Sequence, residues 1–121
     1  MSGDAVWPTE IRLRPDRRSL VVRFDDGGDY DLPAEYLRVL SPSAEVQGHS
    51  PEQRKTVPGK RDVTIAAVTP VGNYAVRLTF SDRHDSGLYT WRYLRKLGEE
   101  RDGLWAAYLR ELEEKRMSRA S

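Results

Sequence analysis

The sequence predicts an α+β fold in which small, mainly antiparallel β-sheets pack against short helices and a C-terminal amphipathic helix. Several short runs alternate apolar and polar residues, which is the period of a half-buried strand. Two later stretches instead carry apolar residues three or four positions apart, which is the spacing of an amphipathic helix. The chain has 121 residues, a length typical of a single domain.

The first predicted strands lie close together near the N-terminus. Apolar and charged residues alternate over 11–14 and again over 20–25, and a short returning strand is expected over 30–32. The intervening residues 26–29 contain two adjacent glycines, which tolerate the positive φ angles of a tight hairpin turn. Two or three antiparallel strands are therefore expected to open the domain.

A short helix and a long loop should follow. Residues 33–40 begin with proline, which suits the first helical turn, and place their apolar residues on one face. Residues 41–62 contain three prolines and two glycines with few large apolar side chains. We expect this segment to be an exposed and mobile loop.

The second half of the chain predicts another pair of strands. Residues 63–68 are fairly apolar on both faces, which predicts a central strand, and residues 70–73 should turn the chain. Residues 74–81 show the clearest alternation in the sequence, with Arg77 on the face expected to meet water. Residues 81–89 should form a polar connector.

Two helices are expected to complete the chain. Thr90 can cap a helix that runs through Leu97, with Gly98 as its C-terminal stop. A last helix should run over about 102–117, and the tail 118–121 should fray. Both helices carry apolar stripes that should pack in the core, and these include Trp91, Tyr93, Trp105 and Tyr108.

Composition excludes several functional classes. The chain contains no cysteine, which excludes disulfides, thiolate metal ligands, iron–sulfur ligation and a cysteine nucleophile. No apolar run approaches the ~20 residues of a membrane span, and no signal-peptide pattern precedes the first strand. We therefore expect a cytoplasmic protein without membrane attachment. Its net charge of +1 gives no general attraction to nucleic acid, although the basic segments 10–25 and 52–62 leave weak anion or nucleic-acid binding as the alternative.

Only two histidines are available for catalysis or metal binding, His49 in the long loop and His84 in the polar connector. The carboxylates of Asp82 and Asp85 beside His84 could raise its pKa or fix its tautomer. Asp82, His84 and Ser86 do not have the spacing or the separate oxyanion hole of a catalytic triad. We expect His84 to form hydrogen bonds at the corner between strand and helix, with a metal-dependent or hydrolytic site as the disfavoured reading.

Several motifs resemble the gamma-butyrobetaine hydroxylase-like N-terminal domain family. They occur in order over about residues 8–98, which leaves 99–121 as a separate C-terminal helix and tail. The motifs are Phe24-Asp25-Asp26-Gly27, Ala34-Glu35-Tyr36-Leu37-Arg38, Val71-Gly72-Asn73-Tyr74-Ala75-Val76, His84-Asp85-Ser86-Gly87-Leu88-Tyr89-Thr90-Trp91 and Tyr93-Leu94.

The resemblance implies an α+β domain and a zinc site that this chain has lost. In relatives, cysteines spaced C-x-C-x-x-C and one histidine hold the ion, and their positions fall here on Ser41, Ser43, Val46 and His84. Serine and valine do not replace thiolates, so we expect neither a metal nor a cofactor. Arg83 also stands where relatives have glycine. In some relatives the domain precedes a dioxygenase barrel, for which we expect no room in these 121 residues, and other relatives are joined to P-loop carriers of iron–sulfur clusters.

These points favour a non-catalytic binding or adaptor domain, accessory to cofactor or iron–sulfur protein maturation, whose partner is another protein. The site residues should make polar contacts and orient the partner rather than transfer protons. The expected binding residues are Arg38, Ser41, Ser43, Asp82, His84, Asp85, Tyr89 and Trp91.

Overall fold

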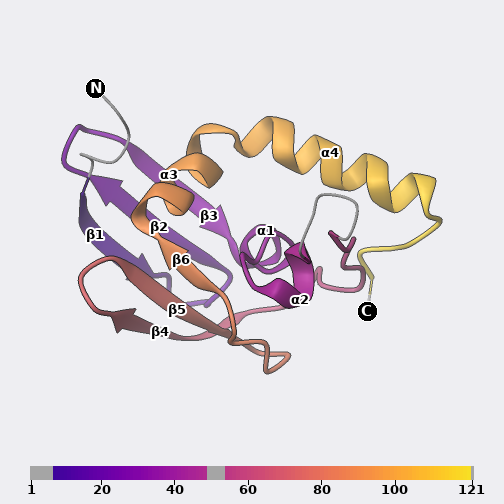
Figure 1. Ribbon diagram of the computed structural model, residues 1–121, viewed down its shortest axis with the longest axis horizontal. Coiled ribbons are helices and arrows are strands. Elements are labelled where there is room, and N and C mark those ends of the chain that lie inside the picture. The colour runs from indigo at the N-terminus through magenta and orange to yellow at the C-terminus, as the bar shows by residue number, and fades with distance from the viewer. Residues whose placement is uncertain (1–6, 49–53, 121) are drawn as a thin grey trace.

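A computed structural model describes residues 7–48 and 54–120. Within these residues the chain forms two three-stranded sheets and four helices (Figure 1). The strands are β1 (Pro8–Leu13), β2 (Ser19–Phe24), β3 (Asp29–Pro33), β4 (Ile65–Val71), β5 (Ala75–Phe80) and β6 (Leu88–Thr90). The helices are α1 (Ala34–Val39), α2 (Ala44–Gln47), α3 (Trp91–Glu99) and α4 (Arg101–Glu114). Helix α3 lies against the strands, whereas α1, α2 and most of α4 lie to one side of them. The predicted α+β class is confirmed.

The first sheet confirms the hairpins expected near the N-terminus. Its order is β1-β2-β3, and Val22 of the central strand pairs with Ile11 on one side and Tyr30 on the other. Gly27 adopts a φ of +93° in the turn between β2 and β3, a conformation that favours glycine.

The second sheet has the order β4-β5-β6, so the expectation that 63–68 forms a central strand is wrong. Much of the apolar character of β4 comes from the small side chains Ala66 and Ala67, which are exposed. Its Pro70 lacks an amide hydrogen and suits an edge strand. The third strand, β6, was not predicted; it overlaps the end of the polar connector and pairs with β5 through Thr90 and Ala75.

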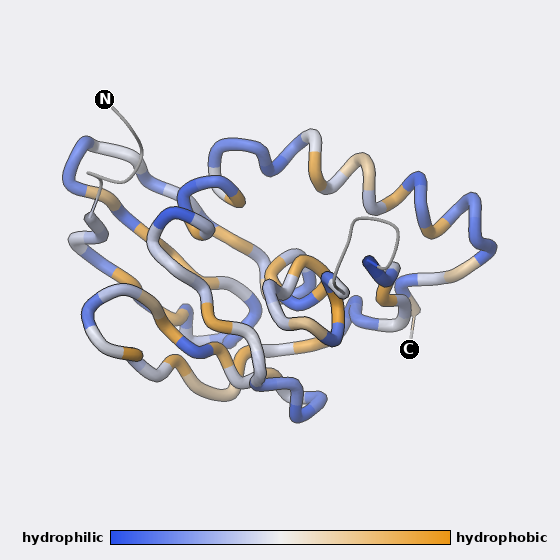
Figure 2. Tube along the Cα trace, in the orientation of Figure 1, coloured by the Kyte–Doolittle hydropathy of each residue, from blue (hydrophilic) through white to orange (hydrophobic). Residues whose placement is uncertain are grey.

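One apolar core joins both sheets to the helices. The hydrophobic stretches in Figure 2 follow the strands and α1, whereas the connector between β5 and β6 is hydrophilic. As expected, Arg77 on the central strand β5 is exposed. The fully buried core side chains include Leu20, Val22, Leu32, Leu37, Ile65, Leu78, Leu94 and Leu97.

The two C-terminal helices differ from prediction at their ends. Thr90 caps α3 as expected, because its side chain accepts a hydrogen bond from the amide of Tyr93 at 3.1 Å. Gly98, however, lies inside α3 rather than after it. A Cβ at Gly98 would lie 2.5 Å from the ring of Tyr30, so this glycine permits a close approach of helix and sheet. The last helix ends at Glu114, earlier than expected.

The long loop and the tail are more ordered than the sequence suggested. Residues 44–47 form α2, and the amide of Lys55 donates to the carbonyl of Val46 at 2.7 Å. Residues 118–120 are also tied to the fold rather than frayed, since the amides of Gly59 and Arg61 donate to tail carbonyls at 2.8 and 3.0 Å. His49 lies outside the described residues. None of the helices in the described part of the chain is long and apolar enough to cross a membrane.

Candidate functional site

Two segments distant in sequence meet at a polar corner. One segment is residues 38–45, from the end of α1 into α2, and the other is residues 81–87 between β5 and β6. The second segment begins with a tight turn in which the amide of Arg83 donates to the carbonyl of Phe80 and the amide of Phe80 donates to the carbonyl of His84, both at 2.9 Å. The turn holds His84 inward, where it is only 7% exposed.

The imidazole of His84 joins the two segments. Its Nε2 lies 2.9 Å from the Ser41 hydroxyl and 3.4 Å from the Ser43 hydroxyl, and its Nδ1 lies 3.4 Å from a carboxylate oxygen of Glu45. A carboxylate only accepts hydrogen bonds, so the contact with Glu45 favours the proton on Nδ1. Nε2 is then free to accept the hydrogen of Ser41.

Burial sets the charge of this histidine. Removal from water lowers the pKa of His84, and the nearby cation Arg38 lowers it further, while Glu45 and Asp82 act in the opposite direction. The net shift is downward, because burial outweighs the raising effect that was expected of neighbouring carboxylates and that Asp82 exerts. The imidazole is therefore neutral in the folded protein near neutral pH.

A second group of charges braces the same corner. Asp82 binds Arg38 at 2.8 Å and Lys60 at 2.6 Å, and it accepts the backbone amide of His84 at 3.1 Å. Burial acts to raise the pKa of Asp82, but the bonds from Lys60, the His84 amide and Arg38 together bring it down to about 2. Asp82 is thus an ionised anchor for two loops and not a proton donor.

Close packing completes the corner. A Cβ at Gly87 would lie 2.5 Å from the Ser41 hydroxyl, so only glycine lets the two segments approach this closely. Beneath them, the hydroxyl of the fully buried Tyr89 donates to the carbonyl of Leu37 at 2.5 Å. This bond satisfies one of the carbonyls that the end of α1 leaves free.

The structure brings together most of the predicted site residues. Arg38, Ser41, Ser43, Asp82 and His84 form the connected network described above. The other three predicted residues are placed differently: Asp85 is exposed beside the network, Tyr89 lies beneath it, and Trp91 lies at the far end of β6, where its indole donates to the carbonyl of Asn73.

Two residues of the corner were not predicted, Glu45 and Lys60. Both come from the segment read as a mobile loop, and neither belongs to a recognisable motif. The short helix α2 brings Glu45 over the histidine. The sequence could not reveal this helix, because its four residues are too few to show helical periodicity.

The order Ser41–His84–Glu45 is that of a hydrolase triad, but its serine is not placed to react. Ser41 is 0% exposed, and its oxygen also accepts the amide of Ser43 at 3.3 Å. A nucleophile needs access to substrate and an adjacent oxyanion hole. The grouping of Asp82, His84 and Ser86 does not form either, because Asp82 binds the histidine's backbone amide rather than its ring.

The residues at the corner also do not fit the zinc site that the resemblance implies for relatives. Serine hydroxyls are poor zinc ligands at neutral pH and Val46 has no donor atom. Within residues 7–48 and 54–120, no group of three or more His, Cys, Asp or Glu side chains is placed to hold a metal ion. The arrangement is suited to holding two loops in a fixed shape.

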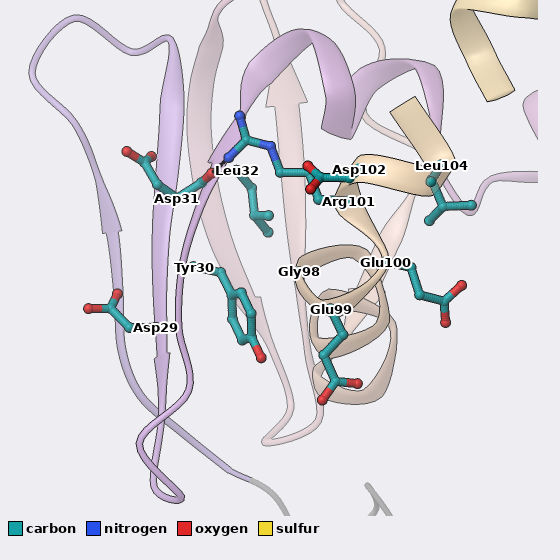
Figure 3. Close-up of a pocket in the computed structure, with 11 residues that line it drawn as sticks. Asp29, Tyr30, Asp31, Leu32, Gly98, Glu99, Glu100, Arg101, Asp102 and Leu104 are labelled. Carbon is teal, nitrogen blue, oxygen red and sulfur yellow. Dashed lines mark hydrogen bonds between the residues drawn. The ribbon is translucent and has the colours of Figure 1, made fainter. Parts of the chain in front are cut away.

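A hollow lies elsewhere, between β3 and the turn from α3 to α4 (Figure 3). It has a volume of about 510 Å³, and five of its eleven lining residues are acidic. Figure 3 shows that its carboxylates point away from one another. Asp29 and Asp31 are paired with arginines at 3.4 and 2.9 Å, so the hollow does not form a convergent site.

Comparisons with known proteins relate this geometry to one family. The sequence model described as gamma-butyrobetaine hydroxylase-like, N-terminal, matches residues 11–95. No curated protein matches the chain.

Solved structures of similar proteins share the fold. Two proteins studied by NMR in solution are 48% and 44% identical, with TM-scores of 0.80 and 0.82; the matches cover 93% and 98% of this chain and 89% of each of theirs. A crystal structure of a DUF971-family protein of unknown function from Acidithiobacillus ferrooxidans is 42% identical, with a TM-score of 0.63. That match covers 75% of this chain and 91% of the other.

Proposed function

The chain belongs to the gamma-butyrobetaine hydroxylase-like N-terminal family, and from this premise we propose that it is a cytoplasmic protein-binding or adaptor domain without a catalytic step of its own. The observation that carries the proposal is the closed network of the polar corner. Ser41 and His84 are buried and bonded to each other, and Asp82 is held by two cations. Side chains that are buried or bonded to one another in this way hold a surface in a fixed shape and are not available to react with a substrate.

The exposed rim of the corner supplies the recognition surface. Arg83, Asp85 and Ser86 stand on the turn that His84 anchors, and the Glu45 side chain beside them is 72% exposed. We call these four residues the rim. A rigid support lowers the entropy lost when a partner binds such side chains. The rim therefore suits contact with another protein.

The family supplies the context for that partner. Relatives joined to P-loop carriers of iron–sulfur clusters suggest a role accessory to cofactor or iron–sulfur protein maturation. A chain with no cysteine has no thiolates for a cluster, so in this role the partner holds the cofactor and this domain binds the partner. The proposal includes the loss, in this chain, of the zinc site that the resemblance implies for relatives.

The alternative function, weak anion or nucleic-acid binding, receives less support. Arginines of the basic segment 10–25 are engaged with carboxylates: Arg12 binds Glu10 at 2.8 Å and Arg14 binds Asp31 at 2.9 Å. Phosphate binding would compete with these contacts.

Affinity capture from native lysate tests the proposal. The wild-type chain is compared with the rim variants Asp85→Lys and Glu45→Lys, and with Arg110→Glu on the exposed face of α4 as the matched charge-change control. We expect a cofactor-binding protein to be retained by wild type and by Arg110→Glu, and to be lost from both rim variants. Equal retention by all four chains, or retention on heparin that disappears with salt, would count against the rim as a protein-binding surface.

A further inference from the structure

The tail after α4 lies on the domain in the manner of a bound peptide. Beyond Glu114 the chain turns at Arg116, which has a φ of +55°, and the yellow segment in Figure 1 folds back toward the residues that precede β4. There the carbonyls of Ser118 and Arg119 accept the amides of Gly59 and Arg61. These main-chain bonds are of the kind by which proteins bind extended peptides.

One side chain of the tail enters a specific site. Arg119 makes two parallel bonds of 2.8 Å, from Nε and Nη2, to the two carboxylate oxygens of Glu35 on α1. Its guanidinium carbon also lies 5.4 Å from the centre of the Trp105 ring. A planar guanidinium fits this combination of carboxylate fork and aromatic face better than an ammonium does.

Glu35 shows that the site is built for a cation. Its side chain is only 8% exposed, and a buried carboxylate is costly unless it is paired. In the part of the chain that the structure describes, Glu35 forms its ion pair with Arg119, which lies 84 positions along the chain and outside every helix and strand. The required positive charge is thus carried by a segment held through few contacts.

Space remains beside the bound guanidinium. A cavity of about 220 Å³ is lined by Pro33, Glu35, Tyr36, Arg101, Trp105 and Arg119. Arg119 itself is 39% exposed. A guanidinium in this position can therefore leave without disruption of the core.

We propose that Glu35, Trp105 and the amides of Gly59 and Arg61 form a receptor for an extended, arginine-bearing segment of a partner protein. The tail occupies this receptor in cis, and the partner's arginine replaces Arg119 when the tail is displaced. The receptor is distinct from the rim, although Lys60, between its two backbone donors, binds Asp82 at the polar corner. The tail is in effect a built-in competitor whose high local concentration must be overcome.

A peptide titration of the full chain tests this inference. The probe is a blocked peptide that copies residues 116–120, and the reporters are the NMR signals of the Gly59 and Arg61 amides and the Trp105 indole. We expect the peptide to bind Arg119→Ala about ten-fold or more tightly than wild type, where the tail competes. A peptide with lysine at the position of Arg119 should bind about ten-fold more weakly than the arginine peptide, because an ammonium cannot donate two parallel hydrogen bonds to the Glu35 carboxylate.

Two further variants make the result decisive. Glu35→Gln combined with Arg119→Ala should abolish the arginine preference, since a neutral amide replaces the carboxylate. Should Arg119→Ala fail to fold, Arg119→Lys keeps a cation beside Glu35 and takes its place in the titration. Absence of binding at millimolar peptide, equal affinity for both peptides, or equal affinity of wild type and variant would overturn the inference. The Asp85→Lys rim variant should titrate like wild type, which separates this test from that of the proposed function.

Discussion

His84 is the residue on which the polar corner depends. It bonds through both ring nitrogens and through its backbone amide, and it is buried. We expect His84→Ala to lower the free energy of unfolding by about 1–3 kcal/mol, because the hydroxyl of Ser41 and its neighbours then lose their partner. Urea denaturation measures the change, and an unaltered midpoint would contradict a structural role for this histidine.

The lowered pKa of His84 predicts how stability depends on pH. The unfolded chain, with an ordinary pKa of 6.5, binds the proton more tightly than the folded protein does. This contribution to stability is therefore complete above pH 6.5 and is lost as the pH falls from 6.5 toward the folded-state pKa. Asp82, with a folded-state pKa of about 2, changes charge well below this window.

Measurement of unfolding free energy from about pH 8 down to about pH 5 checks this sign. The wild type should lose stability over the range, and His84→Asn should lose less, because asparagine keeps hydrogen-bonding groups without a titrating ring. His49 is present in both chains, so it cancels in the comparison. A wild type that gains stability toward pH 5 relative to the variant would show that the folded-state pKa is raised instead.

Arg83 occupies a backbone conformation that costs stability. Its φ is +72°, in the left-handed region where a side chain is disfavoured by roughly 1–2 kcal/mol. We expect Arg83→Gly to stabilise the domain by about 0.5–1 kcal/mol, since the greater freedom of glycine in the unfolded chain offsets part of the gain. Arg77→Gly in β5 is the control, because glycine weakens a strand. Thermal denaturation that finds Arg83→Gly less stable would contradict the argument.

Sequence reasoning at this scale succeeded where a motif was present. The resemblance placed Ser41, Ser43 and His84 at one site, and the structure brings them within 3.4 Å. The net downward shift of the histidine pKa could not be predicted, because adjacent carboxylates are visible in a sequence, whereas burial is not. Glu45 and Lys60 escaped notice because their contacts depend on the path of a loop.

At the scale of elements, Gly98 shows how packing overrides local preference. Glycine in a helix interior is normally a weakness of about 1 kcal/mol relative to alanine. Here an added Cβ would lie 2.5 Å from the Tyr30 ring, and the ring would have to move. We expect Gly98→Ala to destabilise the domain by about 1–3 kcal/mol, as overpacking does.

Gly103 in α4 is the matched control. A Cβ there meets nothing within 4 Å, so Gly103→Ala should instead stabilise the domain by up to about 1 kcal/mol. Urea denaturation of both variants checks the opposite signs. Stabilisation by both changes would mean that the contact between α3 and β3 yields easily.

Elements with a clear period were predicted well and the others were not. Alternation identified β1, β2, β3 and β5, in which exposed residues are interspersed with buried or half-buried ones, although in β2 Val21 is buried as well as Leu20 and Val22. The three-residue β6 and the four-residue α2 are too short to show a period. The strand order in the second sheet could not be predicted, because it depends on tertiary pairing. The small apolar side chains of β4 also suggested a strand buried on both faces, although they are exposed.

Across the whole molecule, tyrosine hydroxyls tie elements together. Four tyrosine hydroxyls each donate a hydrogen bond of 2.5–2.6 Å to a main-chain carbonyl more than fifty positions away in the sequence. The pairs are Tyr36 to Leu97, Tyr89 to Leu37, Tyr93 to Leu40, and Tyr108 to Val57. Apolar spacing placed Tyr93 and Tyr108 in the core, but the hydroxyl partners could not be predicted, because a carbonyl acceptor has no sequence signature.

The buried tyrosines should therefore contribute through their hydroxyls as well as their rings. Burial raises the pKa of Tyr89, and it raises that of Tyr93 to about 12. Tyr89→Phe leaves the buried carbonyl of Leu37 without its donor, so it should lower the free energy of unfolding by about 1–3 kcal/mol. The double variant with Tyr93→Phe should depart from additivity, because the two ring centres lie 6.1 Å apart and both hydroxyls donate to carbonyls at the same end of α1.

Tyr74→Phe, at a position 50% exposed, is the control and should change stability little. Equal urea midpoints for Tyr89→Phe and Tyr74→Phe would show that packing alone, without these hydroxyl bonds, holds α1 against the second sheet.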